Sequence, residues 1–268
     1  MDDGIHIMIY DEDALTPDEA FLTEAERAQL KTLGYTRRRW AEWIRGRLAV
    51  RHALATLQGN RFDKATPPRY EKLHQHGDSK QKTHPAPAGR PSGGGDFFGP
   101  YGDKSPLERG AERSEAGCVN QPSSKLLFEN VTALGGCDVL SAPDGAPYVT
   151  GGLDYAVSLS HDGAYVAVAL AQGRGRRIGV DLCLRAHTAR VRRILDRLGV
   201  EASPIDPVAQ WAALECVIKL RRRSVTTLFD AALSLERRAE ALVVRGLGAP
   251  ALVHPSAYEN FVVCTGAS

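Results

Sequence analysis

The chain opens on an alternating pattern and then changes to a helical one. Residues 5–10 place isoleucine at every second position, which predicts a strand with at least one buried face. Thr23 is followed three residues later by Glu26, the arrangement of a capping box at the start of a helix. The apolar positions that follow keep helical spacing as far as Gly34, so we expect this helix to end there.

A second and longer helix is predicted from residue 37 to residue 57. Its polar positions are nearly all arginine: Arg37, Arg38, Arg39, Arg45, Arg47 and Arg51. Arg47 and Arg51 are four residues apart and share one face of the helix. They are able to present two cations to one anion, although a basic helical face is also typical of a surface that simply meets water.

Beyond residue 150 the pattern predicts strands. Two β-branched or apolar runs, 155–159 and 164–171, flank the turn-forming tetrad Ser160-His161-Asp162-Gly163, which predicts a hairpin. A further short strand is predicted over 178–182. Asp181 stands inside it between two apolar residues, and a buried carboxylate needs hydrogen-bond partners or a bound group.

The most informative helix is predicted over 207–220, with Asp206 as its N-cap and proline at its first position. After Trp211 only Glu215 and Lys219 are polar as far as residue 220, and the three are spaced four apart on one stripe. Such an ion pair is common on protein surfaces. In a helix that is apolar on nearly all sides it also fits the wall of a cleft.

Residues 60–125 differ in composition from the rest of the chain. They hold 8 of the 15 prolines and 9 of the 26 glycines but only three aliphatic side chains, too few to offset the entropy of ordering the segment. We therefore expect a disordered insertion. The alternative is a long surface loop with a short helix near 105–115.

Composition excludes several classes of protein. The 268 residues carry a net charge of +2, which gives no electrostatic case for a nucleic-acid partner. No apolar run reaches the roughly 18 residues that span a bilayer, and the first residues are acidic, unlike a signal peptide. The five scattered cysteines suggest neither a disulfide framework nor a zinc site. We expect a soluble, cytoplasmic monomer that binds no membrane.

Five segments, taken in order, resemble the 4'-phosphopantetheinyl transferases of the Sfp type. They are the capped first helix, the arginine helix with Gly46-Arg47-Leu48, then Ser158-Leu159-Ser160-His161, Ile178-Gly179-Val180-Asp181, and Trp211 to Lys219 as Trp-x-x-x-Glu-x-x-x-Lys. No single motif is specific, so the order and spacing of the five carry the resemblance. It covers nearly the whole chain except the insertion.

The resemblance implies an α+β fold of two similar subdomains related by pseudo-twofold symmetry. Each would have a small antiparallel sheet packed on a long helix. The N-terminal half would be 1–160, interrupted by the insertion at about 60–125. The C-terminal half would be 161–268 and would carry the metal site.

The resemblance also implies a reaction. The 4'-phosphopantetheine arm of coenzyme A would move to a serine of an apo acyl or peptidyl carrier protein, with release of 3',5'-ADP, as in polyketide or nonribosomal peptide biosynthesis. Asp181 and Glu215 would hold Mg²⁺, Glu215 would also take the serine proton, and Lys219 would steady the phosphate. Coenzyme A would contact a second set of residues: Arg47, Gly145, Ala146, Pro147, Ser160 and His161.

Three positions differ from the family pattern. Cys183 stands where many members have a second acidic metal ligand, Leu214 replaces a lysine before the helix glutamate, and Ala146 replaces the lysine of a Gly-Lys-Pro. Water would then complete a magnesium shell, and Cys183 itself fits a small buried hydrophobe. His161 also fits a turn histidine bonded to the backbone.

Two further hypotheses remain beside an active transferase. One is a weakened or inactive relative that binds coenzyme A or a carrier protein without turnover. The other is an unrelated domain of helices and sheet in which these charged residues have structural roles.

Overall fold

Antiparallel strands form the framework of the computed structural model, which describes residues 4–58, 137–173, 175–201 and 203–268. All of these residues belong to one compact unit. The predicted insertion and its alternative short helix lie outside the described residues. Short 3₁₀ segments accompany the main elements: η1 (Glu12–Ala14), η2 (Glu19–Phe21), η3 (Arg185–His187) and η4 (Val225–Leu228).

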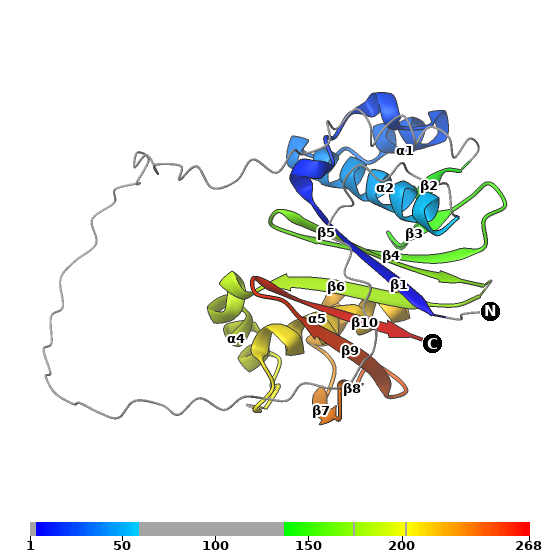
Figure 1. Cartoon of the computed structure of the whole chain (residues 1–268). Helices are drawn as coiled ribbons and strands as arrows, with labels where there is room; N and C mark the ends of the chain where they lie inside the picture. The colour runs from blue at the N-terminus through cyan, green and yellow to red at the C-terminus, as the bar shows by residue number, and fades with distance from the viewer. Residues whose placement is uncertain (1–3, 59–136, 174, 202) are drawn as a thin grey trace, which may run out of the picture. The chain divides into compact units, whose positions relative to one another are not determined.

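A three-stranded sheet forms around the N-terminal strand. Its order is β1-β5-β4, with β1 (Ile5–Asp11), β5 (Tyr165–Gln172) and β4 (Tyr155–Asp162) all antiparallel. Helix α2 (Arg37–Leu57) packs on this sheet (Figure 1). Apolar side chains of the helix and of β1 and β5 form one hydrophobic core there. The predicted strand and the predicted bounds of the long helix are both confirmed.

The hairpin between β4 and β5 is tighter than predicted. Pairing continues from Tyr155–Gln172 to Asp162–Tyr165, so Ser160, His161 and Asp162 belong to the strand and not to the turn. The turn itself is Gly163 with the next residue, and Gly163 adopts the positive φ of 56° that glycine tolerates. The prediction of a four-residue turn was therefore wrong. The consequence is that Ser160 sits on a regular strand face.

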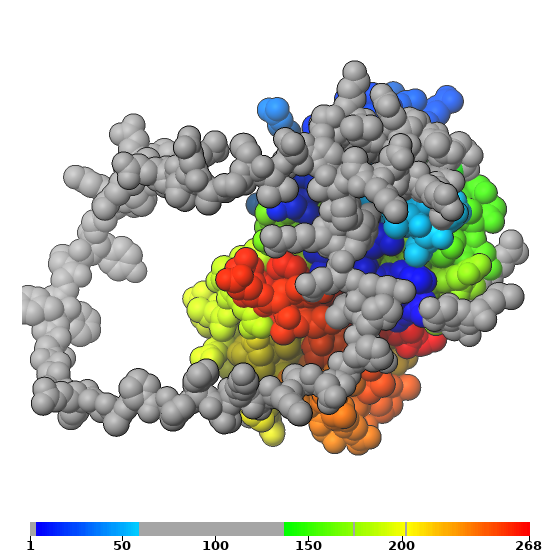
Figure 2. Space-filling model, in the orientation of Figure 1, coloured from blue at the N-terminus to red at the C-terminus, as the bar shows by residue number. Residues whose placement is uncertain are grey.

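A five-stranded sheet contains the strands that follow β5 in the chain. Its order is β6-β10-β9-β8-β7, from β6 (Ile178–Leu184) and β10 (Phe261–Ala267) to β9 (Ala251–Ala257), β8 (Ala241–Arg245) and β7 (Ser234–Arg238). Helix α5 (Pro207–Arg221) packs on β6 and β10, and α4 (Thr188–Arg197) packs on α5. A second core surrounds α5. Figure 2 shows the orange and red residues of the last strands gathered together on the visible face.

Helix α5 lies unusually close to β6, and glycine makes this possible. A Cβ atom at Gly179 would lie 2.2 Å from the backbone oxygen of Cys216, closer than real Cβ atoms approach. The start of α5 follows the prediction, because the Asp206 side chain accepts the backbone N–H of Val208 at 2.9 Å. The close approach places the middle of α5 directly against the strand that carries Asp181.

A small hairpin completes the N-terminal part. Strands β2 (Val139–Ser141) and β3 (Pro147–Val149) pair with each other. Helix α1 (Glu24–Thr32) begins with the predicted capping box and packs on β2. The Gln29 side-chain amide binds both the backbone N–H and the backbone C=O of Ser141, at 2.8 and 2.7 Å. The hairpin is thus attached to α1.

The edge strands of the two larger sheets meet through side chains. From Ser158 to the end of β4, every second side chain accepts a backbone N–H from β6: Ser158 from Val180, Ser160 from Leu182 and Asp162 from Leu184, at 3.0, 3.1 and 2.9 Å. Small alanines of β5 pack against apolar residues of β6 and β10. We call the three bonds the β4–β6 ladder.

The predicted mixture of helices with small antiparallel sheets is confirmed. Strand β5 lies past residue 160, where the sequence places the division between halves, yet it pairs with β1 and β4. None of the helices in the described parts of the chain combines the length and the apolar character needed to cross a membrane.

Candidate active site

One open pocket of about 1290 Å³ lies among α2, α5, β4, β6 and the β2–β3 hairpin. Residues from both larger sheets line it. All nine residues that the sequence singles out for a site are among them: Arg47, Gly145, Ala146, Pro147, Ser160, His161, Asp181, Glu215 and Lys219. The fold therefore brings together side chains that lie as far apart in sequence as α2 and α5.

Helix α5 presents a single stripe to this pocket. From residue 208 to residue 220 every side chain is buried except Trp211, Glu215 and Lys219, and these three line the pocket. They are spaced four apart, so they follow one face of the helix. The prediction that the pair Glu215 and Lys219 faces a cleft, in place of open solvent, is confirmed.

Asp181 is the buried acid of the pocket, with an exposed fraction of 1%. Its Oδ1 accepts the Ser160 hydroxyl at 2.8 Å and the Lys219 ammonium at 2.7 Å. Lys219 also donates to the Val180 carbonyl at 3.1 Å. The other oxygen, Oδ2, is buried and has no hydrogen-bond partner among the described residues. An orphaned carboxylate oxygen is costly in a protein interior, so this atom is suited to a bound cation or donor.

Glu215 stands beside Asp181. Burial, and next the negative charge of Asp181, raise the pKa of the Glu215 carboxyl well above its usual range, against the lowering effect of Lys219. Two adjacent carboxylates favour either a shared proton or a cation between them. The donor set fits Mg²⁺, which prefers hard oxygen ligands and is commonly held by one or two carboxylates, with phosphate and water completing its shell.

The described part of the chain contains no group of three or more His, Cys, Asp or Glu side chains arranged to hold a metal ion. A cation at this position would therefore take Asp181 and Glu215 from the protein. Cys183 lies on the same face of β6 and is among the residues that line the pocket, but only 4% of it is exposed and it packs in the core around α5. Burial raises the pKa of its thiol to about 12, so it stays a neutral thiol, as expected of a small buried hydrophobe.

The position before Glu215, where Leu214 replaces the lysine of the family pattern, does not face the pocket. Leu214 is fully buried in the core around α5 and is not a lining residue. Position 214 is thus turned into this core and not toward the pocket wall. Ala146, by contrast, lines the pocket. Its replacement of a lysine therefore removes a positive charge from the pocket wall.

Arg47 forms a cationic wall on the α2 side. It is only 4% exposed, and its guanidinium lies 3.6 Å from the centre of the Trp43 ring. It donates to the Val139 carbonyl at 3.2 Å and to the Ser141 hydroxyl at 2.5 Å. Burial lowers its pKa to about 10, so it remains charged at neutral pH. The buried indole N–H of Trp43 has no partner in the described structure.

Arg51 does not join Arg47 in the pocket. It is buried and bonded to Glu26 at 2.5 Å, and it is not a lining residue. The expectation that the two arginines present their charges to one anion was therefore wrong, because Arg51 already has an internal carboxylate. The interpretation as a solvated face also fails for these two residues, since both are buried.

His161 faces the pocket from β4, with 38% of its side chain exposed. Its Nε2 lies 3.3 Å from Arg39 and 3.8 Å from Glu42. Partial burial lowers its pKa, while the charge of Glu42 opposes this effect. The alternative of a turn histidine is wrong, because the residue is part of a strand. Glu42 also forms ion pairs with Arg38 and Arg39. It follows them by four and three residues, a spacing that predicts such pairs on a helix.

The β2–β3 turn forms the opposite rim. Gly145 adopts a positive φ of 83° there, and Ala146 and Pro147 follow it into β3. Asp144 of the same turn pairs with Arg222 at 3.6 Å, across from the end of α5. Arg222 has a left-handed backbone with φ of 52°. Its role as a pocket residue was not predicted.

A histidine and aspartate pair forms another part of the wall that the sequence did not reveal. The Asp162 carboxylate lies 3.1 Å from His187 Nε2 and accepts Leu184 N–H with its other oxygen. Both residues line the pocket. Because they lie 25 residues apart, no local spacing in the sequence indicates that they form a pair.

Comparison of the chain with models of known protein families found no match. Comparison with functionally curated proteins also found no match.

Proposed function

We propose that this protein is a Mg²⁺-dependent 4'-phosphopantetheinyl transferase. It would move the phosphopantetheine arm of coenzyme A to a serine hydroxyl of an apo acyl or peptidyl carrier protein and release 3',5'-ADP. The single observation that carries the proposal is the meeting of α5 and β6. There Asp181, with its orphaned Oδ2, stands beside Glu215 and Lys219 on the wall of a pocket that also contains Arg47.

The pocket offers the charges that coenzyme A requires. Coenzyme A carries a diphosphate and a 3'-phosphate, and buried cations bind such groups strongly because water competes poorly with them. Arg47 and Lys219 would supply positive charge to phosphate, His161 would offer a ring N–H, and the turn with Ala146 would lie along the adenine. A volume of about 1290 Å³ exceeds the roughly 300–1,000 Å³ of sites for drug-sized ligands, which suits an extended nucleotide.

The reaction is a phosphoryl transfer in which the serine oxygen attacks the diphosphate phosphorus nearer the pantetheine. A new P–O bond forms to serine, the P–O bond to the bridging oxygen breaks, and 3',5'-ADP leaves. Glu215 accepts the serine proton. A carboxylate within reach of the attacking hydroxyl is one of the groups that serve as a general base in such transfers.

Asp181 and Glu215 are the residues that would hold Mg²⁺. When bound, the ion supplies positive charge beside the diphosphate as the leaving group gains charge. Lys219 orients Asp181 through their 2.7 Å contact. The Ser160 hydroxyl fixes the same carboxylate oxygen from β4.

The proposal extends to the symmetry of the fold. Each larger sheet has one long helix packed on it, α2 on the first and α5 on the second, which supports two similar halves related by a pseudo-twofold axis. Superposition of the two halves in an experimental structure tests this. Failure to align α2 with α5 would contradict it.

The deciding experiment is a transfer assay by intact-protein mass spectrometry. The purified chain is mixed with coenzyme A, Mg²⁺ and a panel of apo acyl and peptidyl carrier proteins. We expect one carrier to gain the mass of one phosphopantetheine. Glu215→Gln should lower the rate at least about 10²-fold, the lower end for losing one acid–base group. Glu240→Gln, on an exposed turn, is the matched control and should leave the rate unchanged.

Two outcomes of these measurements would contradict the proposal. If coenzyme A with Mg²⁺ raises the melting temperature but no carrier gains mass, the chain is a binding module without turnover. If neither effect is seen, the charged residues of the pocket serve the fold alone.

A further inference from the structure

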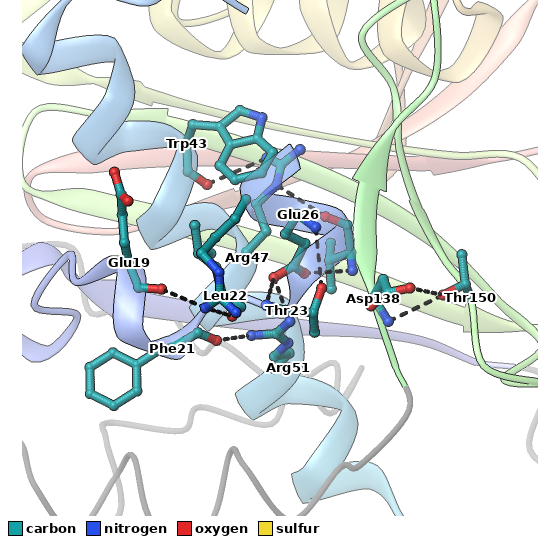
Figure 3. A network of polar contacts seen from close by, with 12 residues as sticks. Glu19, Phe21, Leu22, Thr23, Glu26, Trp43, Arg47, Arg51, Asp138 and Thr150 are labelled. Carbon is teal, nitrogen blue, oxygen red and sulfur yellow. Dashed lines mark hydrogen bonds and ion pairs between the residues drawn. The ribbon is translucent and has the colours of Figure 1, made fainter. Parts of the chain in front are cut away.

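Three charged side chains, Arg47 among them, lie buried on the α2 side of the pocket. Glu26 of α1 and Arg47 and Arg51 of α2 have exposed fractions of 0, 4 and 3%. Figure 3 shows them together with the chain segments that they join. We call these three residues the buried triad. Its formal charge is +1, and buried charge is unfavourable without a partner.

The Glu26 carboxylate is fixed by donors from three segments. Its Oε2 accepts the Arg51 guanidinium at 2.5 Å and the Thr23 backbone N–H at 3.0 Å. Its Oε1 accepts the Val139 backbone N–H at 2.7 Å. Arg51 in turn donates to the Phe21 carbonyl. A fully buried carboxylate with this many charged and neutral donors is held in one orientation.

Val139 transmits that orientation to Arg47. Its N–H binds Glu26 while its carbonyl accepts the Arg47 Nε–H at 3.2 Å. Two residues further along β2, the Ser141 hydroxyl accepts another N–H of Arg47. Glu26 and Arg47 therefore bind the same short strand, one at the N–H and one at the carbonyl of Val139. Their own side chains form no direct hydrogen bond with each other.

The same contacts leave two N–H groups of Arg47 without a partner among the described residues. A guanidinium has five N–H donors, and bonds to Val139, Ser141 and the Trp43 carbonyl engage three of them. The ring of Trp43 covers one of its flat faces. Glu26 is bonded to Arg51, so the excess charge of the triad resides on Arg47 at the pocket wall. An anion of the ligand would balance it.

We infer that Glu26 and Arg51 are positioning residues for anion binding: they fix β2 so that Arg47 points its free N–H groups at a phosphate of the ligand. The inference rests on the proposed function for the identity of that ligand. A purely structural role would lower the stability of the protein. It would leave the affinity of the folded protein for the ligand unchanged.

The test is calorimetric titration of the full chain with 3',5'-ADP, at a temperature where every variant is folded by circular dichroism. In Glu26→Gln, one amide N–H₂ replaces a carboxylate oxygen, so either Arg51 or Val139 loses its acceptor and β2 is released. We expect affinity to fall about tenfold, the scale of one charge-assisted contact. Glu24→Gln, exposed on the same helix, is the matched control and should bind as the wild type does.

A double-mutant cycle shows whether Glu26 acts through Arg47. In the Arg47→Ala background the effect of Glu26→Gln should shrink to less than about twofold, because the group that Glu26 positions is gone. If Glu26→Gln does not fold, Arg51→Lys replaces it. That variant keeps the charge but loses the fork that joins Glu26 to the Phe21 carbonyl, and it should weaken binding about threefold or more.

Each result has one meaning. Wild-type affinity in a folded Glu26→Gln or Arg51→Lys variant overturns the inference and leaves the proposed function standing. An undiminished effect of Glu26→Gln in the Arg47→Ala background also overturns it. Absence of 3',5'-ADP binding by the wild-type chain overturns the proposed function itself, and the inference with it.

Discussion

Replacing Ser160 by alanine tests how Asp181 is oriented. The Ser160 hydroxyl is buried, accepts the Leu182 backbone N–H at 3.1 Å and donates to Asp181 Oδ1 at 2.8 Å. Its removal leaves a buried N–H of β6 without an acceptor, which costs about 1–3 kcal/mol of unfolding free energy. It also leaves Lys219 as the one remaining donor to that oxygen among the described residues.

Ser158 provides a control on the same strand face. It too is buried and accepts a β6 backbone N–H, that of Val180 at 3.0 Å, but its hydroxyl makes no bond to Asp181. Ser158→Ala and Ser160→Ala should therefore lose similar stability. Only Ser160→Ala should slow transfer at limiting Mg²⁺, by about tenfold, because a hydrogen bond to a charged group contributes about 1.5–3 kcal/mol and about 1.4 kcal/mol corresponds to tenfold.

Two measurements separate the effects. Urea unfolding followed by circular dichroism gives the free energy of unfolding of each variant. Initial transfer rates over a Mg²⁺ titration, at saturating coenzyme A and carrier protein, give the functional loss. Equal functional losses in the two variants at equal stability would refute the role of Ser160 in orienting Asp181.

Three further predictions concern other residues. Arg47→Ala should raise the coenzyme A concentration for half-maximal transfer about tenfold with little change at saturation, whereas Arg192→Ala, exposed on α4, should not; an unchanged requirement with earlier melting would mean that Arg47 is only structural. Cys183→Glu places a carboxylate in a buried position beside Asp181, so it should melt earlier than the wild type without Mg²⁺ and recover with it; a melting temperature that ignores Mg²⁺ would show that position 183 does not reach the ion. Burial lowers the pKa of His52 to about 4, so the folded state binds fewer protons than the unfolded state below pH 6.5, and stability present above that pH should fall by up to about 3 kcal/mol as the pH drops toward 4. His52→Gln should flatten this part of the urea-unfolding pH profile, and an identical slope in both proteins would contradict the assignment.

Local signals were enough for the helices that carry the site. The predicted bounds of α2 agree with the structure, because arginines and apolar residues repeat with helical spacing over 21 residues. The stripe on α5 was equally visible, since Glu215 and Lys219 are the polar exceptions in an apolar run. Asp181 was found because a carboxylate is unusual in an apolar strand.

Long-range partners were beyond the reach of local patterns. Arg51 pairs with a glutamate 25 residues away, and nothing in the helix itself distinguishes it from Arg47. Three contacts made by side chains of β4 with the backbone of β6 likewise have no sequence signature. No element was predicted past residue 220, where β7 to β10 depend on pairing with one another and not on a strong local pattern.

The β4–β6 ladder also protects the molecule against self-association. An edge strand with unpaired N–H groups is a template onto which another chain can add a strand. Ser158, Ser160 and Asp162 occupy those groups on β6, and Lys219 occupies the Val180 carbonyl. Partial separation of the two sheets would uncover this edge on the very strand that carries Asp181. Loss of the site and the onset of aggregation would then be one event, with a rate that rises with protein concentration.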